Sequence, residues 1–142
     1  MGNTKPIGVA YEDQDIIGAD NVSAVDIYAS DEIGYTAAAQ GTVTQLTSKS
    51  TGVTINASAG QITMNNAALA ATTNVAFTMT NSKVGPKDVV IANVAAGTAG
   101  TDTYNCWVSG HAAGSCTFVL RNISGGSLSE AVVLNFAIIH CV

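Results

Sequence analysis

Charged residues are scarce in this sequence. They make up 11% of the 142 residues, with 5 Lys and Arg against 10 Asp and Glu, where an ordinary globular domain has roughly 25%. Nucleic-acid binding depends on Lys and Arg contacts to phosphates, so a chain with so few basic residues is not expected to bind nucleic acid. The 47% hydrophobic content argues equally against a disordered chain.

Long apolar runs are also missing. No stretch reaches the ~18 consecutive apolar residues of a membrane-spanning helix. The first 30 residues lack the basic start and apolar run of a secretion signal. We therefore expect no membrane partner and synthesis in a reducing cytoplasm. The length predicts one domain that is large enough to bury its own core.

The few charges are unevenly placed. Residues 1–32 contain seven acidic residues and one basic residue, which gives a net charge of -6. Residues 33–142 contain three acidic and four basic residues, which gives a net charge of +1. The acids alternate with apolar residues, so the segment is either a solvated terminus or an arm that docks on a basic partner surface. We predict an arm over 1–40, with candidate contact residues Glu12, Asp13, Asp15, Ile16 and Ile17, and a body over 41–142.

The body has the pattern of a β protein. Runs rich in Val, Ile and Thr alternate between apolar and polar residues and end at Gly, Asn and Ser clusters. Such runs predict strands at 42–47, 52–56, 60–64, 74–80, 88–94, 104–109, 115–122 and 131–142. Segments 35–40 and 65–71 are ambiguous between a short helix and a turn. Short strands at this spacing predict an all-β, single-domain sandwich with Greek-key or jelly-roll connections.

The last predicted strand, 131–142, is apolar on both faces. Such a strand is expected either in the centre of a sheet or between the body and another subunit. We assign Leu134, Phe136 and Ile138 as candidate subunit-interface residues.

Catalytic motifs are not evident. A triad of Ser109 or Ser115 with His111 and Asp102 is formally possible, but no G-x-S-x-G elbow accompanies it, and we predict no enzyme activity. The acidic cluster at 12–15 does not continue as an EF-hand, because Ile17 takes a ligand position and Ala24 replaces the closing Glu. No cofactor or metal is predicted.

The cysteines leave three alternatives open. Cys106 and Cys116 fall on one face of a hairpin with other apolar residues, which favours buried thiols that fill core space. A disulfide between them, or a zinc site with His111 and the His140-Cys141 pair, are the other two. Trp107, on the opposite face, is a candidate sugar platform or interface anchor.

Several sequence runs of the body resemble those of a known protein family. The runs GTVTQLTSKSTGVT (41–54), GQITM (60–64) and AFTMTNS (76–82), with AGSC (113–116), GSLSEA (126–131) and LNFAII (134–139), are similar to small virion proteins of tailed bacteriophages. These proteins resemble head decoration, or cement, proteins.

The resemblance covers about residues 41–142 and implies no catalytic residues. It implies a homotrimer in the virion, on the outside of the head, with the major capsid protein as partner, stabilising the shell. The alternative is a receptor- or glycan-binding module of a phage head or tail fibre.

Overall fold

The computed structural model describes residue 29 and residues 32–141. The chain from Gly34 onward forms one compact unit. Its elements are a 3-10 helix η1 (Ala37–Ala39) and the strands β1 (Gln40–Thr44), β2 (Val53–Thr54), β3 (Ala59–Thr63), β4 (Asn74–Thr80), β5 (Val89–Ala96), β6 (Tyr104–Ala112), β7 (Ser115–Asn122) and β8 (Val133–Ile139).

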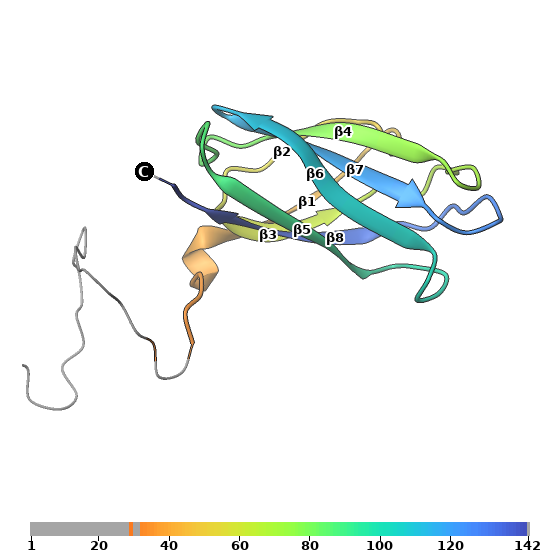
Figure 1. Ribbon diagram of the computed structural model, residues 1–142, viewed down its shortest axis with the longest axis horizontal. Coiled ribbons are helices and arrows are strands. Elements are labelled where there is room, and N and C mark those ends of the chain that lie inside the picture. The colour runs from red at the N-terminus through yellow and green to blue at the C-terminus, as the bar shows by residue number, and fades with distance from the viewer. Residues whose placement is uncertain (1–28, 30–31, 142) are drawn as a thin grey trace, which may run out of the picture. The chain divides into compact units, whose positions relative to one another are not determined.

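The strands form two four-stranded sheets that pack face to face (Figure 1). One has the order β1-β3-β8-β5 and is called the β8 sheet here. The other has the order β2-β4-β7-β6 and is called the β7 sheet. Both are mixed, because β1 runs parallel to β3 and β2 runs parallel to β4 while the other neighbours are antiparallel.

The core lies between the sheets and follows from period-2 alternation. Along β8, Leu134, Phe136 and Ile138 point inward and are buried, while the residues between them are only partly covered. Phe118 of β7 stacks on Phe77 with ring centroids 5.4 Å apart and meets Phe136 edge-on at 6.3 Å. The first contact lies within the β7 sheet, and the second joins the two sheets.

The hairpin between β6 and β7 shows how local sequence sets the register. Ala112 pairs with Ser115, so Ala113 and Gly114 form the turn. Gly114 has φ +79, a backbone conformation that glycine adopts without steric penalty. A bulge between Val108 and Gly110 then shifts the pairing by one residue.

The all-β sandwich predicted from the sequence is confirmed, and the last strand is central in its sheet. The ambiguous segment 65–71 forms no helix and instead contributes a single bridge, Leu69 to Leu128. The other ambiguous segment contains η1. Residues 35–40 contact the body, because Gln40 of β1 pairs with Ala59 and the Tyr35 hydroxyl donates to the Ile138 carbonyl. Within this segment, Gln40 Nε2 donates to the Tyr35 carbonyl at 2.8 Å.

Candidate functional site

The outer face of the β8 sheet is the most unusual surface of the described chain. Register places Thr42, Gln61, Asn135 and Asn93 side by side in one row across all four strands. Gln61 Nε2 donates to Asn135 Oδ1 at 3.0 Å. The row, called the amide ladder here, covers the middle of the face with neutral groups that both donate and accept hydrogen bonds.

Three exposed apolar side chains lie beside the amide ladder. Val89 and Ile139 are direct cross-strand partners, and Ile91 lies two residues further along β5 on the same face. Their exposed fractions are 49%, 52% and 52%. We call Val89, Ile91 and Ile139 the apolar strip. Scattered exposed apolar residues are ordinary, but adjacent ones on a sheet face are typical of a surface that another molecule covers.

This outer face carries no charged side chain on any of its four strands as described. Its outward residues are Gln40, Thr42, Thr44, Ala59, Gln61, Thr63, Val89, Ile91, Asn93, Ala96, Val133, Asn135, Ala137 and Ile139. A solvated sheet face usually bears Lys, Arg, Asp or Glu. Their absence from a whole four-stranded face indicates that solvent is not its only neighbour.

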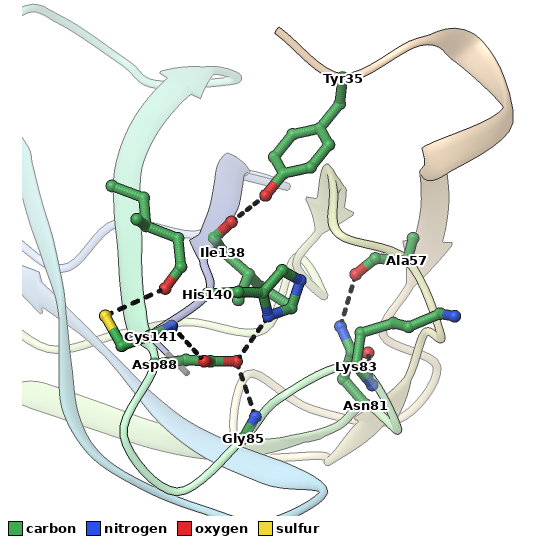
Figure 2. Close-up of polar contacts among 10 residues, drawn as sticks. Tyr35, Ala57, Asn81, Lys83, Gly85, Asp88, Ile138, His140 and Cys141 are labelled. Atoms are coloured by element: carbon green, nitrogen blue, oxygen red, sulfur yellow. Dashed lines mark hydrogen bonds and ion pairs between the residues drawn. The ribbon is translucent and has the colours of Figure 1, made fainter. Parts of the chain in front are cut away.

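A depression of ≈ 700 Å³ opens over the β1, β3 and β8 half of this face. It is lined by the Tyr35 side chain, by Gln40 and Thr42 of β1 and by Gln61 and Asn135 of the amide ladder. The Tyr35 hydroxyl donates to the carbonyl of Ile138 (Figure 2), which fixes this side chain against β8. All of these lining groups are neutral.

The end of β8 is fastened by Asp88, which is 5% exposed. Figure 2 shows its two carboxylate oxygens facing the Gly85 amide, the His140 ring and the Cys141 amide. Oδ2 accepts from the Gly85 N–H at 2.7 Å and lies 2.9 Å from His140 Nδ1, and Oδ1 accepts from the Cys141 N–H at 3.0 Å. The Gly85 and Cys141 amides, followed by His140, lower the pKa of Asp88 below its ordinary value.

A second polar cluster holds a buried lysine. Lys49 is 3% exposed, and its Nζ donates to the carbonyls of Asn65 at 2.5 Å and Glu130 at 2.6 Å. Burial lowers its pKa, and the Glu130 charge partly offsets this. The Tyr104 hydroxyl donates to Glu130 Oε2 at 2.6 Å, and burial together with this bond raises the pKa of Tyr104. These groups join loops to the sandwich.

The predicted interface residues Leu134, Phe136 and Ile138 lie inside the chain's own core, with exposed fractions of 0%, 4% and 0%. Because side chains alternate along a strand, a second subunit meeting β8 would contact Asn135, Ala137 and Ile139 instead. The structure therefore moves the candidate interface to the opposite face of the same strand.

The structure also distinguishes among buried thiols, a disulfide and a zinc site for the cysteines. Cys106 pairs with Leu120 and Cys116 pairs with His111, so the two thiols are not opposite each other, and both are free. They are buried in the core, and burial raises the pKa of each to about 11. This is the space-filling arrangement. Among residues 29 and 32–141, no three His, Cys, Asp or Glu side chains gather as a metal site requires.

The formal catalytic triad does not assemble. Asp102 precedes the nine-residue strand β6 and His111 lies near its far end, which separates them by about 25 Å. Trp107 is half-buried on the outer face of the β7 sheet, where it flanks Val119. The arm candidates Glu12, Asp13, Asp15, Ile16 and Ile17 lie outside the described residues.

Sequence reasoning missed the apolar strip and the Asp88 cluster. Val89 and Ile91 alternate with core residues, so the signal for the strip was a second apolar face on β5 beside the two-faced β8. The Asp88–His140 contact joins residues 52 apart, and no local pattern predicts it.

Comparison of the chain with protein-family models, with curated proteins and with solved structures found no match. None of the helices that the structure describes is long and apolar enough to cross a membrane.

Proposed function

We propose that this chain is a structural virion protein that binds the outside of a tailed-phage head as an oligomer and stabilises the shell. The observation that carries the proposal is the charge-free outer face of the β8 sheet, with the apolar strip uncovered. Such a face suits contact with another protein surface and offers no charged group for chemistry. The sequence resemblance to head decoration proteins points to the same role.

The second part of the proposal assigns different roles to the sandwich and to the acidic segment. The sandwich associates with other copies, and the acidic segment with Glu12, Asp13, Asp15, Ile16 and Ile17 grips the major capsid protein. Several arms on one oligomer multiply a weak contact through their effective concentration. Bridging neighbouring capsid subunits then slows their separation.

The test is sedimentation of purified protein with heads that lack it. We expect the protein to pellet with the heads and to raise the temperature at which they rupture. Replacing Asp13 and Asp15 with Asn should weaken the pelleting severalfold, whereas Asp102→Asn, which changes an exposed loop carboxylate of the body, should leave it unchanged. Protein that stays in the supernatant at every concentration contradicts the proposal.

A second candidate function is recognition of a neutral glycan. The observation that favours it is the depression beside Tyr35, because an aromatic ring with the amides of Gln61 and Asn135 offers the groups that bind sugar hydroxyls. An array of neutral oligosaccharides distinguishes the two. Binding that is lost in Gln61→Ala but kept in Trp107→Ala supports the glycan site, and an array without hits removes it.

A further inference from the structure

We propose that a second copy of this chain covers the outer face of the β8 sheet, with the two β8 sheets packed against each other around a twofold axis. The inference rests on the proposed function, which requires an oligomer. It replaces the threefold arrangement expected from the sequence resemblance with a pair.

The lack of charge on this face argues against a charged partner surface and favours a neutral one. A basic or acidic partner would lose hydration at this face and find no opposite charge among its outward residues. A second copy brings a face that is equally neutral. Residues 33–142 carry a net charge of only +1, so two sandwiches repel each other little at close range. Each whole chain carries a net charge of -5, and the repulsion between two whole chains comes from residues 1–32 and is screened by salt.

The amide ladder is complementary to itself. Gln61, Asn135 and Asn93 each carry both donor and acceptor groups, and they follow one another across three neighbouring strands. Because each of these amides carries both groups, the amides of one copy can donate to and accept from the amides of a second copy. An isologous interface needs this kind of self-complementary patch.

The apolar strip supplies the driving force. Val89, Ile91 and Ile139 are each about half exposed in the single chain, and burying them removes apolar surface from water. The face is about 19 Å wide and about 20 Å long, judged from strand spacing and rise, and the depression beside Tyr35 lies over its β1, β3 and β8 half. The face thus offers less than half of the ~800 Å² per partner of a standard interface, so we expect a weak, concentration-dependent association.

The test uses a matched pair of Asn→Asp variants in the full chain. Asn93 lies on the outer face of the β8 sheet and Asn105 on that of the β7 sheet, and both are exposed strand residues. Sedimentation equilibrium from about 10 µM to about 1 mM should show a rise from one to two chains for wild type and for Asn105→Asp. Asn93→Asp should weaken association by at least about tenfold, because it places two uncompensated charges in the interface. Thermal melts check that both variants are folded.

Three results overturn the inference. The first is a wild-type mass of one chain throughout, and the second is a trimer. The third is an equal weakening by both substitutions, which would place the contact elsewhere.

A thiol probe identifies the occupant of the face. In a Cys141→Ser background, which removes the exposed native thiol, maleimide modification of Asn93→Cys should slow as protein concentration rises, and that of Asn105→Cys should not. Slow modification at all concentrations means that the chain covers the face itself, and fast modification at all concentrations means that nothing does. Either result overturns the proposal.

Failure here is distinguishable from failure of the proposed function. A protein that stays single in free solution but pellets with heads loses the twofold pairing and keeps the capsid role. A protein that pairs through this face but does not pellet with heads keeps the pairing and loses the capsid role.

Discussion

Both sheets of the sandwich contribute side chains to the core, but they differ on their outer faces. The outer face of the β7 sheet carries Arg121, and its apolar residue Val119 is 7% exposed between Ala76 and Trp107. The outer face of the β8 sheet has no charge on its described strands and leaves Val89 and Ile91 half exposed. The chain itself covers Val119 on the outer face of the β7 sheet, but it leaves Val89 and Ile91 on the outer face of the β8 sheet exposed.

The difference between the outer faces indicates which residues stabilise the fold and which residues serve association with a partner. Both inner faces follow the alternation of apolar residues, because burial against the opposite sheet stabilises the chain. Nothing in folding requires an uncharged outer face, and a charge-free sheet surface carries a risk of unwanted pairing. We therefore attribute the neutral face to association.

The largest expected effect contrasts the two faces of β8 itself. Phe136→Ala should lower the free energy of unfolding by about 3–5 kcal/mol, because it removes a core ring that contacts Phe118. Ile139→Ala, one strand position from the core and 52% exposed, should lower it by less than about 1 kcal/mol. Urea unfolding measures both, and similar losses would mean that the inner and outer faces are wrongly assigned.

The second prediction compares a Gly→Ala substitution in each sheet. A Cβ on Gly60 of β3 would lie 2.1 Å from the Gly41 carbonyl oxygen, whereas a Cβ on Gly110 of β6 meets nothing within 4 Å. Gly60→Ala should lower the free energy of unfolding by about 1–3 kcal/mol through backbone displacement. Gly110→Ala should be neutral or stabilising by up to about 1 kcal/mol. The same denaturant titration decides, and a tolerated Gly60→Ala would contradict the close approach of β1 to β3.

Acid should loosen the β8 sheet before the β7 sheet. The pKa of Asp88 is lowered from its ordinary value of 3.8, so the stability it contributes is present above that pH and is lost as the pH falls below it, through the folded-state pKa. The ends of the β7 sheet are held in part by the buried amides of Asn81 and Asn122, which do not titrate.

The measurement is hydrogen-exchange protection at pH values around and below 3.8. We expect amides of β5 and β8 to lose protection first in wild type. In Asp88→Asn, the difference between the two sheets should no longer depend on pH over this range. Simultaneous loss in both sheets of the wild-type protein would contradict a separate fastening by Asp88.

The sandwich could be predicted from the sequence because its signals are local. Alternating runs such as 74–80 and 115–122 mark strands whose bounds match the structure, and the hairpin at Gly114 follows from its turn residues. Strand order could not be predicted, since the parallel pairing of β1 with β3 depends on long-range contacts.

The candidate site was harder to predict for a similar reason. The two-faced pattern of β8 indicated an interface on this strand, but the pattern alone did not say which face points to the core. Leu134, Phe136 and Ile138 are buried in the core, and large apolar side chains are the ones that a core selects. The neutral row of Thr42, Gln61, Asn135 and Asn93 emerges only when four strands are aligned.

Cryo-electron microscopy of the virion that contains this chain tests the central claim most directly. The account predicts density for the sandwich on the outside of the head, with the outer face of the β8 sheet against a second copy and the outer face of the β7 sheet toward solvent. Density in a tail, or sandwiches on the head whose β8 sheets face open solvent, would contradict it.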